Sequence, residues 1–168
     1  MTEARLYHLL GVVGALAFCV EGVFLPISLA AHVLLLLSFR RLSTGPSPYA
    51  WFVSASTASL MTALALGTTP LRMLVTPYPY EPGNAVAVAL LWLASGWFYW
   101  DVARSIDTGP LGRGSAVAYV LGAGLFPVRI GWMLVIAAMV MLALALLRPY
   151  LAQQLLYSEA RVSGSARP

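Results

Sequence analysis

The sequence predicts an all-α fold, a polytopic membrane helix bundle with about six transmembrane helices arranged as three hairpins. Two observations lead to this class. Of the 168 residues, 60% are hydrophobic and 10% are charged, whereas a soluble domain carries about a quarter charged residues. The apolar residues also gather into runs of the length that crosses a bilayer. Disorder, a secreted disulfide scaffold and a water-soluble enzyme are therefore excluded.

Six apolar segments are the candidate spans. Glu21-Gly22 and Pro26 interrupt the first long apolar run, and Pro127 and Arg129 interrupt the last one. Each run is too long for a single span, so a helical hairpin with a short turn is the economical interpretation. The first, second and fifth segments are short, and in an alternative arrangement the first and fifth are re-entrant, with four full spans. The six segments cover residues 6–20, 24–39, 49–67, 84–103, 114–127 and 130–147.

The arginines agree with this helix count. With both termini in the cytoplasm, eight arginines fall on the cytoplasmic side and two, Arg72 and Arg129, fall on the outer side. This distribution is the positive-inside bias of multi-pass membrane proteins. Because the arginines are spread between apolar segments, nucleic acid is excluded as a partner. The cytoplasmic set is Arg5, Arg40, Arg41, Arg104, Arg113, Arg148, Arg161 and Arg167.

The chain is divided into a transmembrane domain over residues 1–149 and a polar cytoplasmic tail over residues 150–168, which we expect to be flexible. The longest connection is an outer loop from Thr68 to Gly83, and its four prolines forbid a regular helix. A Gly-rich cytoplasmic loop is predicted from Ile106 to Gly114.

Four charged residues are candidates for transport or ion pairing. Glu21 lies at the outer end of the first segment, and an acidic residue at membrane depth suggests proton or cation handling. The interpretation we favour pairs it with Arg129 at the tip of the other hairpin. Asp101 and Arg104 are three residues apart on one helical face, so we expect them to pair as well.

Two histidines are the candidate ligands for a cofactor. His32 lies well inside the second segment and His8 near the cytoplasmic end of the first. Their different depths argue against a haem bound by both within one chain, although a haem shared between two copies would use His32. The single Cys excludes an intramolecular disulfide and a Cys-based metal cluster. We predict no metal site, no catalytic residue and no cofactor, because none of the familiar motifs occurs.

Small residues recur at every fourth position in two segments. This spacing lets helices approach closely and lets hydroxyls bond across the gap. It serves a bundle core and an oligomer interface equally well. The helix-packing candidates are Ser54, Ala58 and Thr62 in the third segment and Gly114, Ala118 and Gly122 in the fifth.

The chain opens with a short Gly-containing helix (Leu10 to Cys19), a tight turn, and an apolar helix that ends in Phe39-Arg40-Arg41-Leu42. An aromatic belt from Trp97 to Trp100, a Gly-containing linker and a second tight hairpin follow. This pattern resembles an uncharacterised archaeal family of small multi-pass membrane proteins, known as a domain of unknown function. The resemblance implies the plasma membrane of a prokaryote, and no activity or site residue comes with it.

Three functions follow as hypotheses. The leading one is a non-catalytic membrane subunit or oligomer-forming scaffold, whose partners are the lipid bilayer and a homo-oligomer or larger membrane complex. The second is a small-solute or ion transporter or channel acting as a homo-oligomer, with Glu21, His32 or Arg129 in its path. The third is a haem- or quinone-binding redox subunit that uses His32, which predicts a Soret band or a bound quinone.

Overall fold

The computed structural model describes residues 3–20, 25–43, 49–66, 82–106, 108–128 and 130–164. Over these ranges the chain is all-α, with six α-helices, one short 3-10 helix and no strand. The outer loop predicted from Thr68 to Gly83 falls almost entirely outside the described residues. The elements are α1 (Glu3–Phe18), α2 (Leu25–Leu42), α3 (Tyr49–Ala65), α5 (Pro82–Ser105), α6 (Gly109–Gly124), η1 (Phe126–Val128) and α7 (Gly131–Gly164).

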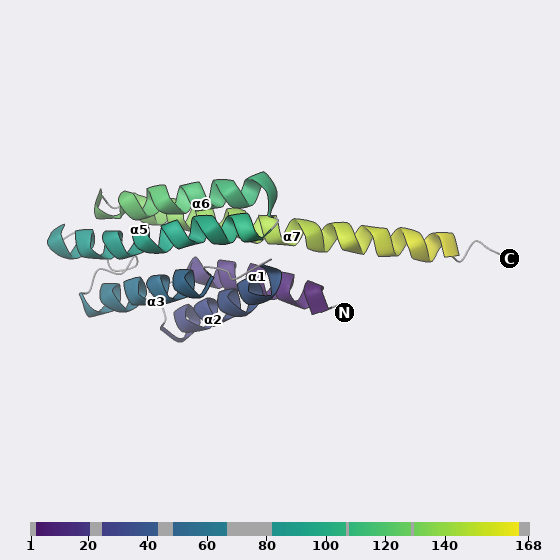
Figure 1. Ribbon diagram of the computed structural model, residues 1–168, viewed down its shortest axis with the longest axis horizontal. Helices are drawn as coiled ribbons and strands as arrows, with labels where there is room; N and C mark the ends of the chain where they lie inside the picture. The colour runs from purple at the N-terminus through teal and green to yellow at the C-terminus, as the bar shows by residue number, and fades with distance from the viewer. Residues whose placement is uncertain are drawn as a thin grey trace.

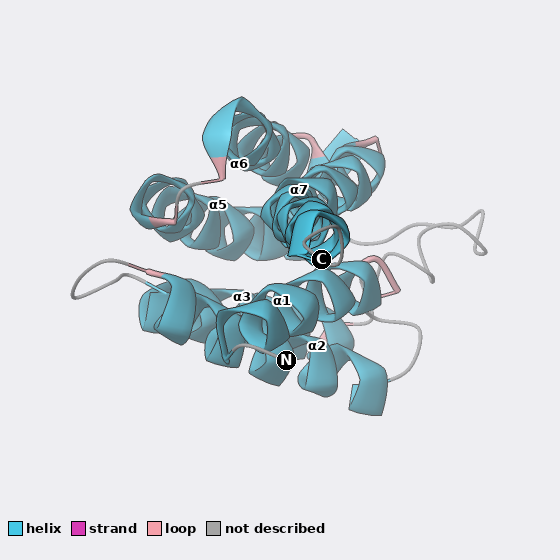
Figure 2. Cartoon of the chain, turned by 90° about the vertical axis from the view of Figure 1, so that its right-hand side faces the viewer, coloured by secondary structure: helices cyan, strands magenta, loops and turns pink. Residues whose placement is uncertain are grey.

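The helices lie side by side in two layers, with α1, α2 and α3 in one and α5, α6 and α7 in the other (Figures 1 and 2). Each helix contacts the next one along the chain, and α7 returns to contact α1. The most extensive contacts join α1 to α2, α3 to α5 and α6 to α7. These are the pairs that the sequence analysis groups into hairpins.

The hairpin turns lie where prolines and glycines were expected to break the apolar runs. Helix α1 ends at Phe18, and α2 begins at Leu25 with Pro26 in its first turn. Proline is favoured there because the first amides of a helix have no intrahelical acceptor. At the other hairpin, Pro127 lies within η1, and the Gly131 amide donates to the Leu125 carbonyl at 3.2 Å. Both long runs are therefore divided as predicted.

Helix α6 starts earlier than predicted, so the expected loop from 106 to 114 is wrong. The helix begins at Gly109, which has a φ of 63°, and Pro110 lies in its first turn. A Cβ added to Gly112 would overlap the side chain of Thr108, which packs over it. Position 112 in the first turn of the helix therefore requires glycine, because a side chain there would take the space that Thr108 occupies.

Helix α7 is longer than predicted. It does not end at residue 147 but continues to Gly164 with Pro149 inside it, and it extends well past the end of the bundle (Figure 1). Residues 151–161 are mostly Leu, Ala, Gln, Glu and Arg, which have high helix propensity. This propensity accounts for the helical continuation, and the flexibility of the tail stays a prediction.

Aromatic side chains join the two layers into one core. The ring of Phe52 in α3 lies 5.1 Å from Tyr99 in α5 and 6.0 Å from Tyr119 in α6, measured between centroids. Phe18 in α1 reaches the same Tyr119 ring at 6.4 Å. All four side chains are buried. Because large aromatics bury the most apolar area per residue, these contacts dominate the packing between the layers.

Candidate functional site

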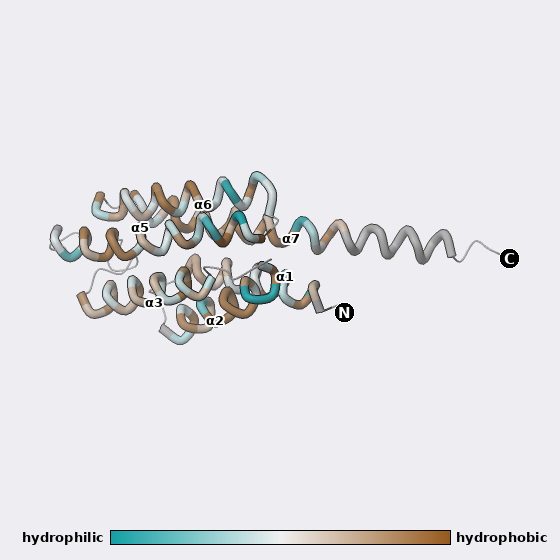
Figure 3. Tube along the Cα trace, in the orientation of Figure 1, coloured by the Kyte–Doolittle hydropathy of each residue, from teal (hydrophilic) through white to brown (hydrophobic). Residues whose placement is uncertain are grey.

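The charged side chains collect at one end of the bundle. Arg41 at the end of α2 lies over the ring of Tyr7 near the start of α1, 5.5 Å from its centroid. His8 hydrogen bonds the backbone of Leu146, which places the start of α1 beside the exit of α7. The strongest hydrophilic colour in Figure 3 falls at this end. The arginine end contains every arginine side chain that the structure describes: Arg5, Arg40, Arg41, Arg104, Arg113 and Arg148.

The predicted pair of Asp101 and Arg104 is not formed. Both side chains are exposed at the end of α5. The guanidinium of Arg104 lies over the Trp100 ring, 5.9 Å from the centroid, and within the described residues it makes no ion pair with Asp101. A surface ion pair adds little free energy in water, so a cation–π contact with a neighbouring indole competes with it. Glu21 and Arg129, the other predicted pair, lie outside the described residues.

Two pairs of hydroxyls join α5 to α6. Ser95 Oγ lies 2.9 Å from Tyr119 Oη, and Tyr99 Oη lies 2.7 Å from Ser115 Oγ. We call these four fully buried residues the Ser–Tyr clasp. Each serine hydroxyl also donates to a carbonyl of its own helix. Because a serine has one proton to donate, each tyrosine is the donor in its pair.

The Ser–Tyr clasp was missed at the sequence level although a signal for it exists. The segments 95–99 (SGWFY) and 115–119 (SAVAY) both place a serine four residues before a tyrosine. This spacing puts both hydroxyls on one helical face. In two antiparallel helices, the serine of each then lies level with the tyrosine of the other, so the repeated motif predicts two reciprocal hydrogen bonds.

His32 is buried and bonded to the protein backbone. Its Nδ1 lies 2.7 Å from the carbonyl oxygen of Ser28, one turn earlier in the same helix. Its ring lies 5.2 Å from that of Phe18. His8 is ten residues before Phe18 in the same helix, about 15 Å away at the rise of an α-helix. Within one chain, His8 and His32 are therefore too far apart to ligate one iron.

The interior does not arrange a serine nucleophile with a histidine base among the described residues. Ser28 is bonded to His32 through its backbone carbonyl, and the Ser56 Oγ has no hydrogen-bond partner. A nucleophile and its base require a direct hydrogen bond between side chains. Over the described ranges, no group of three or more His, Cys, Asp or Glu residues is placed to hold a metal ion.

The two stripes of small residues have different positions. In α6, a Cβ on Gly114 would meet Met141 and one on Gly122 would meet Val135, so this stripe lies against α7. In α3, Ser54 and Ala58 are exposed and Thr62 is half-buried, so of the two roles left open for that stripe the bundle core makes little use of it. The buried face of α3 is set by its larger residues and carries Phe52, Val53, Ser56, Ser59, Leu60 and Ala63.

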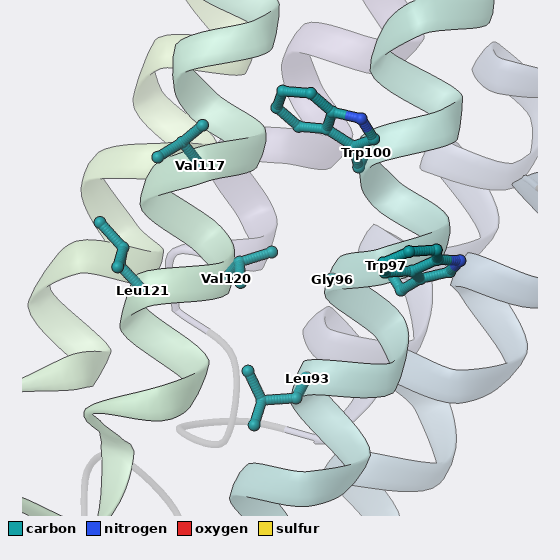
Figure 4. Close-up of a pocket in the computed structure, with 7 residues that line it drawn as sticks. All are labelled: Leu93, Gly96, Trp97, Trp100, Val117, Val120 and Leu121. Carbon is teal, nitrogen blue, oxygen red and sulfur yellow. The ribbon is translucent and has the colours of Figure 1, made fainter.

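A groove runs along the outer surface between α5 and α6 (Figure 4). Its volume is about 530 Å³. Trp97, the most exposed of its side chains, is 74% exposed. We call this the α5–α6 groove; it is lined by Leu93, Gly96, Trp97, Trp100, Val117, Val120 and Leu121.

Large apolar side chains also cover the outward faces of the helices. In α1 they recur at spacings of three and four residues, at Leu6, Leu9, Val13 and Leu16. Leu90 in α5 is 62% exposed. Each of the six described helices carries at least two such residues: the other helices contribute Val33 and Leu37, Trp51 and Met61, Val117 and Leu121, and Val140 and Leu144.

Over the residues that the structure describes, two helices, Gly83–Ser105 and Gly131–Pro149, are long and apolar enough to cross a membrane, and Ala4–Phe18 is a shorter apolar helix. Comparison of the chain with family models, with curated proteins and with solved structures gives no match. The resemblance to an archaeal membrane family stays a prediction, and functional inference depends on the chain's own residues.

Proposed function

We propose that this protein is an integral membrane protein with six spans and both termini in the cytoplasm of a prokaryote, and that it acts as a non-catalytic subunit or oligomer-forming scaffold. The observation that carries the membrane location is the apolar outer surface of every described helix. A helix on the surface of a soluble bundle has one apolar face and one polar face. Helices that are apolar on both faces are typical of a bilayer, where lipid replaces water on the outside.

The arginine end supports the proposed orientation. Arginines are favoured on the cytoplasmic side of a multi-pass protein, and aromatic residues are favoured at the membrane interface. Trp97 and Trp100 lie one to two turns from Arg104 in α5. Helices α1, α3 and α6 have 16, 17 and 16 residues and are short for a span. A bilayer accommodates such helices by local thinning at modest cost.

The non-catalytic role is supported by how the buried polar groups are used. The Ser–Tyr clasp and the Ser59 hydroxyl, which donates to the Val88 carbonyl at 3.4 Å, hold one helix against another, and the bond from His32 to the Ser28 carbonyl lies within α2. The exposed stripe of Ser54 and Ala58 supports an oligomer, since small outward residues let a second membrane helix approach closely.

The membrane location is tested with Leu90→Arg. In a span, the exchange of leucine for arginine near the centre disfavours insertion by about 3 kcal/mol. On a soluble surface, the same exchange changes the free energy of unfolding by about 0.5 kcal/mol or less. We expect the variant to be lost from membranes while Leu90→Ala is retained. Normal accumulation of a soluble, folded Leu90→Arg protein would overturn the proposal.

The scaffold role is tested by native mass spectrometry of the protein purified from its own membranes in mild detergent. We expect a homo-oligomer or a stoichiometric partner chain. Ala58→Leu should weaken a homo-oligomer, whereas Ala137→Leu, at an exposed position on α7, should leave it intact. A monomer that retains a small solute would contradict the scaffold role and favour a transporter.

A further inference from the structure

We propose that the α5–α6 groove binds one anionic phospholipid, with an acyl chain along the groove and the phosphate at Arg104 and Arg113. The inference rests on the proposed membrane location, because lipid chains meet this surface only within a bilayer. Two features carry it: the shape of the groove and the charges at one of its ends.

The shape of the groove depends on Gly96. A Cβ at this position would lie 2.8 Å from Val120 Cγ2, so α6 packs closely against α5 there, where both residues line the groove. Figure 4 shows Trp97 and Trp100 on the α5 side and Val117 and Leu121 on the α6 side. The volume of about 530 Å³ is within the range of pockets that bind small ligands. All its side chains are aliphatic or indole, which suits a hydrocarbon chain.

The charge at one end of the groove suits a phosphate. Arg104 follows Trp100 by one helical turn and lies over its ring, while Arg113 precedes Val117 by one turn on α6. Residues four apart share a helical face, so each arginine continues a lining stripe of the groove. Both arginines lie at the same end of the groove, because the bond between Tyr99 and Ser115 holds these two positions of α5 and α6 level with each other. Arginine side chains bind phosphate oxygens through paired hydrogen bonds.

The same charges argue against a second copy of this chain as the occupant. A parallel copy in the groove would bring its own arginine end against Arg104 and Arg113, and like charges at an interface are unfavourable. We call the end of the groove that carries Arg104 and Arg113 its mouth. The one acidic side chain described near the mouth is Asp101, which is exposed four residues after Trp97. Among the described side chains, two arginines and one aspartate give this end of the groove a charge of +1. A basic pocket between membrane helices at the cytoplasmic side is a site for acidic headgroups.

The test is a lipid titration of the delipidated protein in detergent, followed by native mass spectrometry. The probes are dioleoylphosphatidylglycerol, which is anionic, and dioleoylphosphatidylcholine, which is neutral overall. Each arginine near an anionic headgroup contributes about a factor of five. We therefore expect Arg104→Gln/Arg113→Gln to weaken phosphatidylglycerol binding about 25-fold and to leave phosphatidylcholine unchanged.

Two controls distinguish binding in the groove from nonspecific attraction of an anionic lipid to the arginine end. Arg40→Gln/Arg148→Gln removes the same charge from the same end of the bundle and should leave phosphatidylglycerol binding almost unchanged. Val117→Trp fills the groove at an exposed position and should weaken both lipids, whereas Val33→Trp, exposed on α2, should weaken neither. Asp101→Asn removes the negative charge at the mouth and should strengthen phosphatidylglycerol binding.

Equal loss in both arginine pairs, or equal binding of the two lipids, would overturn the inference. Alkaline carbonate extraction of wild-type membranes separates this failure from failure of the proposed function. Protein that stays in the membrane but shows no lipid preference refutes the lipid site alone. Protein that is released by carbonate refutes the membrane location, and the lipid site with it.

Discussion

The packing of α6 against α7 at Gly122 provides a quantitative test of the fold. A Cβ on Gly122 would lie 2.7 Å from the Gly131 carbonyl oxygen, 2.8 Å from Val135 Cγ2 and 2.9 Å from the Val135 amide nitrogen. Two of these three atoms belong to the backbone of α7, so they cannot move aside by rotation of a side chain. We expect Gly122→Ala to lower the free energy of unfolding by about 3 kcal/mol, the upper part of the range for overpacking a core.

Gly124 is the matched control, two residues further along the same helix. It is exposed, and the nearest atom to an added Cβ is Leu93 Cδ2 at 3.8 Å, an ordinary contact. Gly124→Ala should leave the stability unchanged or raise it by up to about 1 kcal/mol, because alanine restricts the unfolded chain. The assay is thermal unfolding in one detergent, followed by tryptophan emission. A loss of 3 kcal/mol corresponds to a fall of roughly 6–12 °C in Tm. Equal Tm values for the two variants would refute the close approach at Gly122.

Three further predictions concern the interior and the topology. Tyr99→Phe and Tyr119→Phe should each lower the free energy of unfolding by about 0.6 kcal/mol, typical of a hydrogen bond between membrane helices, and unchanged Tm values for both would contradict the Ser–Tyr clasp. His32→Phe should keep the ring against Phe18 but lose the bond to Ser28, at about 1 kcal/mol. A Soret band that is present in the wild type and absent from this variant would show that His32 is a haem ligand. After Cys19→Ser, single cysteines at Arg148 and at Asn84 should react with a membrane-impermeant maleimide from opposite sides, and labelling of both from one side would contradict the six-span topology.

The helix positions follow from local signals, and that is why the sequence predicts them. Pro26 and Pro127 interrupt apolar runs, and a proline cannot lie in a helix interior without the loss of a hydrogen bond. The errors occur where local signals conflict. Gly109 and Gly112 suggest a loop, but both lie in the first turn of α6, where Thr108 packs over Gly112. Pro149 suggests a stop, yet good helix formers on its far side carry α7 to Gly164.

The contacts between helices were harder to predict, because a single sequence does not say which faces meet. The stripe of Ser54 and Ala58 has the spacing of a packing face, but it lies outside while Phe52 and Ser59 point inward. The two serine–tyrosine pairs become meaningful only when α5 and α6 are placed antiparallel. Asp101 and Arg104 have the right spacing for an ion pair, but their exposure to water and the neighbouring Trp100 favour another contact.

These differences share a physical cause in the two-sided hydrophobicity of the helices. When a helix is apolar all round, hydrophobicity cannot decide which face turns inward, and in lipid it contributes little to association between helices. The choice then depends on residues that pack closely or form hydrogen bonds: Gly122 against α7, Ser59 against Val88, and the Ser–Tyr clasp. Under the proposed membrane location, exchanges among large apolar core residues such as Leu35 should therefore be tolerated better than exchanges of buried glycine, serine or tyrosine. The buried serines and tyrosines that bond between helices are then the residues that orient the bundle.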